Sequence, residues 1–261
     1  MNKAGSDSSV LLGLGVGFGG LLVGFLLEGG KPAGLIGFSA LIIILAGTSG
    51  ALIVSFGMKQ FMTIPRLFKD SLKAALGPSK ELVQLLYNFA EKARREGLLS
   101  LEDDIDKLGD EFLKKGIRLV VDGVDPEIVR NTLENDIALY EHRKKEEVEI
   151  LFQAGGFSPT MGIVGTVMGL VLVLANLGGD AAALGHSIAA AFIATLYGIG
   201  FANLIWLPVA NKLKGKMKEE VLARELILTG ILSIQAGENP SLIKDKLGAY
   251  VEEEIFIEEK K

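Results

Sequence analysis

Two threonines, Thr166 and Thr195, have the side-chain type and the sequence position that could line a path for an ion. Each lies in a long apolar run among small residues at helical spacing, which are Gly162, Gly165 and Gly169 in the first run and Ser187, Ala191, Ala194, Gly198 and Ala202 in the second. Hydroxyl oxygens suit a hard cation, but a hydroxyl alone is a poor ligand and cannot hold a proton in transit at neutral pH. A path built on these residues needs a further group that changes its charge.

That charge-changing group is absent from the apolar runs. The runs contain no Asp, Glu, Lys or Arg, and they are Val10–Leu27, Ala33–Phe56, Phe157–Leu177 and Ser187–Ala210. Ion-coupled proteins place an Asp, Glu or His in the membrane, despite a cost of a few kcal/mol, because that side chain changes its charge. If ions pass, another protein must therefore supply the carboxylate. Small residues also let helices approach closely in lipid, so a pure packing role stays the alternative.

The length of the four runs predicts membrane helices, because about 20 apolar residues cross a bilayer. With 49% hydrophobic residues and 33 glycines, a chain of 261 residues could not bury all four runs in a water-soluble core. The first run is not expected to be a signal peptide, because Glu28–Lys31 lacks a cleavage site and a second run follows at once. If both termini are cytoplasmic, all but Lys31 of the 27 Lys and Arg residues lie inside.

This topology places the two threonines at the same depth. The third span runs outward and the fourth returns, so Thr166 and Thr195 both fall near the middle of the bilayer, facing a common seam. Pro159 and Pro208 are expected at one cytoplasmic level, where they give the two helices bendable inner ends. Two hydroxyls on a seam with prolines at its inner end suit a hydrated path.

The polar segments predict further helices. Apolar residues at spacings of three and four indicate amphipathic helices over Ser79–Arg95 and Leu101–Lys115, followed by a turn at Val121–Val124. Asp125 is a candidate N-cap before Pro126, from which a long polar helix is expected to continue into the third span. The fourth span is expected to continue past Pro208 to Leu232, followed by Gln235–Pro240, a short helix over Ser241–Leu247 and an acidic tail.

The predicted fold is an all-α integral membrane protein with a helical cytoplasmic domain. We divide the chain into residues 1–56 for the first two spans, 57–154 for the cytoplasmic helices, 155–210 for the ion-path spans and 211–261 for the C-terminal helix and tail. With no cysteine and two histidines, the sequence predicts no metal site, cofactor or enzyme, and no phosphate-binding glycine loop is present. Its interleaved charges, with a net charge of −5, argue against nucleic acid.

Several segments together resemble the MotA family of flagellar motor stator subunits. They are Ala93–Glu102, Phe157–Leu170, Ile193–Gly198, Leu207–Lys212 and Gln235–Pro240. The resemblance covers nearly the whole chain, with four spans in the same order. It implies a ring of subunits in the bacterial inner membrane, a pentamer, around two copies of MotB, whose membrane helix carries the ion-binding Asp and whose outer domain grips peptidoglycan.

The resemblance also implies roles for single residues. Arg94 and Glu102 match positions that contact the rotor protein FliG, with Arg95 and Asp103 as weaker neighbours, and Pro159 and Pro208 match positions tied to the conformational step. Thr195 matches a hydroxyl near the carboxylate. Sodium-driven relatives usually carry Thr at the position of Thr166 and many proton-driven ones Ala, which favours sodium and leaves the proton open.

Two other functions stay open. The first is an energising channel subunit similar to ExbB or TolQ, which shares the core of the last two spans but normally has three spans. The second is a membrane scaffold without ion flux, in which every glycine and threonine of the seam serves packing.

Overall fold

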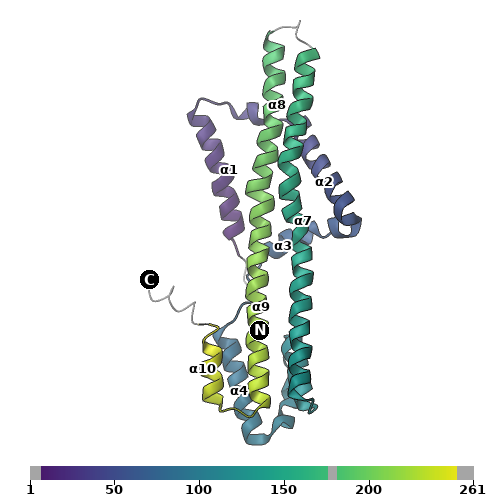
Figure 1. Cartoon of the computed structure of the whole chain (residues 1–261). Helices are drawn as coiled ribbons and strands as arrows, with labels where there is room; N and C mark the ends of the chain where they lie inside the picture. The colour runs from purple at the N-terminus through teal and green to yellow at the C-terminus, as the bar shows by residue number, and fades with distance from the viewer. Residues whose placement is uncertain (1–6, 176–180, 252–261) are drawn as a thin grey trace. The chain divides into compact units, whose positions relative to one another are not determined.

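The computed structural model describes residues 7–175 and 181–251, and these residues form helices without a β-strand. In chain order the elements are α1 (Ser9–Leu27), η1 (Pro32–Leu35), α2 (Phe38–Phe61), α3 (Ile64–Ser71), α4 (Lys80–Glu96), η2 (Leu98–Leu101), α5 (Glu102–Ile105), α6 (Glu111–Val121), α7 (Pro126–Ala175), α8 (Ala181–Phe201), η3 (Ala202–Trp206), α9 (Leu207–Gln235) and α10 (Pro240–Gly248). Figure 1 labels α1 to α4 and α7 to α10. The predicted all-α fold class is confirmed.

Four stretches are long and apolar enough to cross a membrane: Ser9–Leu27, Pro32–Phe61, the apolar part of Pro126–Ala175 and that of Ser187–Gln235. Within the described residues they contain the four predicted spans. The predicted end of the third span at Leu177 and the acidic tail lie outside the described residues.

The chain divides into two compact units. Of the described residues, one unit, here called the polar unit, contains 75–144 and 215–251, and the other, the membrane unit, contains 7–74, 145–175 and 181–214. Helices α7 and α9 each contribute residues to both units. The predicted division after residue 56 falls earlier than the division after Ala74, because α3 packs its buried Ile64 and Leu67 with residues of the membrane unit.

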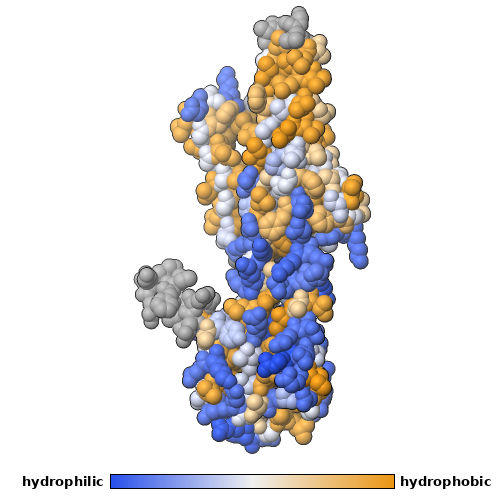
Figure 2. All heavy atoms as spheres, in the orientation of Figure 1, coloured by the Kyte–Doolittle hydropathy of each residue, from blue (hydrophilic) through white to orange (hydrophobic). Residues whose placement is uncertain are grey.

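The polar unit has a core of large aliphatic side chains. Leu86, Leu101, Leu113, Ile117, Leu133, Leu226 and Ile231 are fully buried, and they come from α4, η2, α6, α7 and α9. Burying each such side chain contributes about 1.5–3 kcal/mol. Figure 2 shows hydrophilic residues over much of the surface of this unit and hydrophobic residues over the spans of the membrane unit.

Most predicted helices of the polar segments are confirmed, with one correction. The single helix predicted over Leu101–Lys115 is wrong, since α5 ends at Ile105 and α6 begins only at Glu111. Asp110 adopts an extended conformation and accepts a hydrogen bond from Leu113 N at 2.9 Å, which starts a new helix. The apolar spacing continues across this break because Ile105 and Phe112 belong to the same core.

The long helices begin and continue as expected. Asp125 Oδ1 accepts a hydrogen bond from Glu127 N at 2.9 Å, and α7 then runs from Pro126 to Ala175 without interruption. The fourth span continues past Pro208 to Gln235, and Gly237, with φ +67°, follows this end.

The second span differs from its predicted start. The helix was expected from Ala33, but Pro32–Leu35 forms a 3₁₀ turn, Gly37 is extended and α2 begins at Phe38. The inner end agrees better, because Gly57, with φ +76°, interrupts α2 directly after Phe56. The resulting membrane unit has α7 and α8 side by side, with α2 packed against them and α1 in contact with η3 (Figure 1).

Candidate functional site

Helices α7 and α8 pack closely along a seam of glycines and other small residues. A Cβ added to Gly198 would lie 2.7 Å from the backbone oxygen of Ser158 and 3.0 Å from Gly162 Cα. One added to Gly169 would lie 2.5 Å from Ala191 Cβ, and one added to Gly165 would lie 2.7 Å from Ala194 Cβ. The predicted packing residues therefore bring the two backbones into contact, as small residues do in lipid.

The two threonine hydroxyls meet at this seam, as predicted. Thr166 Oγ1 and Thr195 Oγ1 form a hydrogen bond, and Thr166 Oγ1 also lies 3.1 Å from Gly162 O and 3.0 Å from Ala191 O. Each hydroxyl has one hydrogen to donate. When the Thr166 hydroxyl donates its hydrogen to a backbone carbonyl, the Thr195 hydroxyl must donate to Thr166 Oγ1. The Thr195 hydroxyl can therefore turn and donate to another acceptor instead.

The threonine pair lies beside a face that α2 does not cover. Helix α2 packs on one side of the α7–α8 pair, where Ile43 lies against Gly165 and Met161 against Gly47. Successive residues of a helix are rotated by 100°, so the side chains two residues after Met161 and Gly165 point almost directly away from α2. The exposed large side chains recur there, and we call them the open face: Ile163, Val167 and Leu170 of α7 with Phe192, Leu196 and Ile199 of α8. Thr166 and Thr195 are half-buried.

The two prolines do not lie at one level. Ser158 Oγ donates to Gly198 O at 3.0 Å, whereas a Cβ on Gly155 would lie 2.5 Å from Leu207. In this antiparallel pair, Pro208 therefore lies inward of Pro159 by about two helical turns. The prediction of a common level is wrong. It counted residues from the ends of the spans, whereas the register of the two helices is fixed by contacts between their side chains and backbones.

Tyr197 and Lys212, for which no role was predicted, hold the turn before α2 and the start of α1 in place. The hydroxyl of Tyr197 donates to Leu35 O at 2.6 Å and accepts from Gly37 N at 3.2 Å, which fixes the turn before α2 on α8. A tyrosine in an apolar helix is itself a signal, because its hydroxyl needs a partner. Lys212 pairs with Asp7 and donates to Ser9 Oγ at 2.7 Å, and hydrogen bonds from Lys212 and Ser9 hold the pKa of Asp7 far below its usual range.

The charged residues expected at the rotor lie together in the polar unit. Arg94 and Arg95 occupy the last turn of α4, and Glu102 and Asp103 the first turn of α5, with all four side chains exposed. Between them the chain turns at Gly97, with φ +86°, and is held by the buried Leu101.

An ion pair fixes the relative position of these two turns. Lys92 Nζ lies 2.6 Å from Asp104 Oδ2, and Lys107 Nζ lies 2.8 Å from Asp104 Oδ1. The hydrogen bonds from Lys107 and Lys92 lower the pKa of Asp104 to about 2, and the bond to Asp104 raises the pKa of Lys92. The four exposed charges are thus presented by an anchored support.

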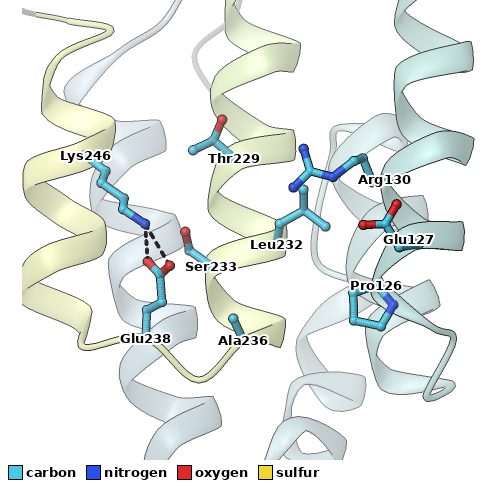
Figure 3. Close-up of a pocket in the computed structure, with 9 residues that line it drawn as sticks. All are labelled: Pro126, Glu127, Arg130, Thr229, Leu232, Ser233, Ala236, Glu238 and Lys246. Carbon is cyan, nitrogen blue, oxygen red and sulfur yellow. Dashed lines mark hydrogen bonds and ion pairs between the residues drawn. The ribbon is translucent and has the colours of Figure 1, made fainter.

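The polar unit also contains a pocket of about 340 Å³ (Figure 3). It is lined by Pro126, Glu127, Arg130, Thr229, Leu232, Ser233, Ala236, Glu238 and Lys246. Both of its cations already have carboxylate partners, because Lys246 lies 2.6 Å from Glu238 Oε2 and Arg130 lies 3.7 Å from Glu134. The pocket is therefore a poor match for an anionic ligand, and the α7–α8 seam is the better candidate site.

Comparisons with known proteins identify the family of this chain. The sequence profile of the MotA/TolQ/ExbB proton channel family matches residues 104–226. Motility protein A of Bacillus subtilis (strain 168) is 38% identical over 246 residues, which cover 94% of this chain and 91% of that protein. Chemotaxis protein PomA of Vibrio alginolyticus is 33% identical over 247 residues, covering 95% and 96%. The solved structure of the flagellar MotAB stator complex from Bacillus subtilis aligns with a TM-score of 0.86 at 38% identity, covering 92% of this chain and 94% of that one.

Proposed function

This chain belongs to the MotA/TolQ/ExbB proton channel family, and we propose that the hydroxyl pair of Thr166 and Thr195 is its part of an ion path. The protein is a membrane-embedded stator subunit of the bacterial flagellar motor. With MotB it forms an ion-conducting unit that converts transmembrane ion flow, of protons or sodium, into torque.

A single observation carries the proposed path. The pair of hydroxyls lies half-buried beside the open face, in spans that contain no residue with a titrating carboxylate. The membrane helix of MotB supplies that carboxylate and packs on the open face. When the carboxylate is loaded with its ion it is neutral and suits the apolar face. When it is empty it is charged and attracts the hydroxyl donor of Thr195, which turns away from Thr166.

The remaining parts of the proposal describe how this switch becomes rotation. Five copies form a ring in the inner membrane, with both termini cytoplasmic, around two copies of MotB. Pro159 and Pro208 let the helices bend near the inner ends of the third and fourth spans in response to the switch. Arg94, Arg95, Glu102 and Asp103 engage FliG, because exposed charges speed repeated transient docking without a large buried interface.

Substituting the hydroxyl tests the path. Thr195→Val keeps the volume and shape of the side chain and removes its donor, whereas Thr195→Ser keeps the donor. With equal expression and equal recovery of MotB, swimming should be lost in the valine variant and largely kept in the serine variant. Unchanged swimming with valine would instead support the scaffold, in which the threonines only pack.

The coupling ion is decided by a separate measurement. We propose that an oxygen at Thr166 suits sodium, so swimming speed should rise with sodium concentration at fixed pH. A flat response would assign the path to protons.

A further inference from the structure

The fourth span is interrupted at its inner end by a π-helical segment. Ala202–Trp206 separates α8 from α9, and Leu207 N donates to Ala202 O, five residues back. The next residue, Pro208, has no N–H to donate. With the same five-residue spacing, the backbone carbonyl of Asn203 would accept a hydrogen bond from residue 208. Because that residue is proline, the carbonyl receives no hydrogen bond from the helix backbone. Breaks of this kind are uncommon and often occur at functional sites.

The side chain of Asn203 adds a second oxygen at this break. Its Nδ2 donates to Ile199 O at 3.0 Å, and this contact fixes the amide orientation, because an oxygen there would face another acceptor. The amide oxygen consequently points away from that carbonyl. In the part of the chain that the structure describes, this oxygen has no hydrogen-bond donor, and the side chain is exposed. An unpaired acceptor on an apolar membrane helix is costly.

Asn203 also continues the open face. On α8 the exposed residues Phe192, Leu196 and Ile199 recur at spacings of four and three, and Asn203 follows four residues later. It lies eight residues inward of Thr195, which is about 12 Å along a helix. The hydroxyl pair and the Asn203 oxygens are thus two polar groups that follow one another along the open face.

We propose that Asn203 and the carbonyl released beside Pro208 form a second oxygen site for the coupling cation, between the threonine pair and the cytoplasm. Hard cations and their hydration water prefer carbonyl and amide oxygens. Interrupted membrane helices bind cations through such unpaired carbonyls. The site receives the cation after it leaves the partner's carboxylate. This proposal rests on the ion path proposed above and adds the inner part of that path.

The test compares three variants of the chain assembled with MotB. Asn203→Leu removes the side-chain oxygen at similar volume, Asn203→Asp adds a charge that attracts a cation, and Asn211→Leu is the matched control on α9. The readouts are the amount of MotB recovered with the chain and the ion flux as a function of the concentration of the coupling ion.

An inner cation site predicts a specific pattern. Asn203→Leu should recover MotB normally, lower the flux by about three- to fifteenfold, the range for one polar contact in a membrane, and raise the half-saturating ion concentration. Asn203→Asp should lower that concentration, and Asn211→Leu should match the wild type.

Two results would overturn the proposal. Equal flux and ion dependence in Asn203→Leu and wild type would mean that the oxygen is not used. Loss of MotB recovery in parallel with flux would assign Asn203 to contact with the partner helix instead. Failure of the ion path itself would appear differently, as a wild-type assembly that contains MotB and passes no ions.

Discussion

The α7–α8 seam of the membrane unit and the core of the polar unit are both helical, yet opposite side-chain choices hold their helices together. In the membrane unit α7 and α8 touch through Gly162, Gly169 and Gly198, where a methyl group would strike neighbouring atoms. In the polar unit the helices are separated by fully buried side chains such as Leu113 and Leu226. Lipid offers no hydrophobic gain for helix association, so close contact must supply the attraction, whereas in water the burial of large side chains does so.

This difference affects how each unit can carry function. The seam places backbone and hydroxyl groups in direct contact, and in the proposed function its geometry responds to one proton or one ion. In the polar unit the four charges expected at the rotor lie outside a filled core, where a single side chain can change without moving the helices. We therefore expect substitutions at the seam to act on coupling, and exposed substitutions in the polar unit to act on docking.

The largest effect is expected for Gly198→Ala. Its methyl group would approach the Ser158 oxygen and Gly162 Cα, which are backbone atoms that cannot rotate away. Overpacking of this kind costs about 1–3 kcal/mol, and separation of the two helices would also pull Thr166 from Thr195. Swimming in soft agar should be abolished.

The matched control for this variant lies two residues along the same helix. A Cβ on Gly200 would meet nothing within 4 Å, so Gly200→Ala should swim normally. Equal swimming of the two variants would remove the distinction between seam and surface on which the comparison depends.

A second prediction concerns the filled core. Leu226 is fully buried, so Leu226→Ala should lower the unfolding free energy of the protein by about 2–5 kcal/mol, because a cavity is left behind. Leu242→Ala is the control, since Leu242 is 50% exposed on α10. Thermal unfolding in detergent measures both. If the two variants melted alike, the polar unit would not depend on its core in the way described.

Sequence patterns predicted the parts of the fold that depend on composition and periodicity. Apolar length predicted the four spans, and the pair Asp125 and Pro126 predicted the start of α7. The break at Asp110 was missed because the apolar residues on both sides of it enter one core. The seam residues and the meeting of Thr166 with Thr195 followed from helical spacing.

The register of the helices could not be predicted in this way. The offset between Pro159 and Pro208 is set by contacts such as that of Gly155 with Leu207, which join residues far apart in the sequence. The π-helical segment at Ala202–Trp206 was not predicted either, because Pro208 after it indicates only a kink and not the spacing of the hydrogen bonds. The roles of the four exposed charges and of the two prolines stay predictions.

A third prediction addresses the support of the charged turns. The folded pKa of Asp104, about 2, lies below its unfolded value of about 3.9, so its ion pairs stabilise the fold at neutral pH. That contribution is lost as the pH falls from about 4 through about 2. Asp104→Asn should therefore lower the melting temperature of the polar unit slightly at pH 7, and the gap to wild type should close between pH 4 and pH 2. A gap independent of pH would mean that the charge of Asp104 is unimportant.

The smallest effect is expected for a single exposed charge, in contrast to the methyl group at Gly198. Arg94→Glu should weaken torque only in part, because Arg95 beside it retains the same charge and exposed pairs contribute about 0–1 kcal/mol. Since Arg94 is exposed on an anchored turn, the assembly and MotB recovery should not change. Reversing an acidic residue of FliG should then restore part of the torque, measured on tethered cells across a range of salt concentrations, with the rescue weakening as salt screens the charges. If reversal of no rotor acid restored torque, Arg94 would be an ordinary solvated charge, and the contact would have to be sought elsewhere on the polar unit.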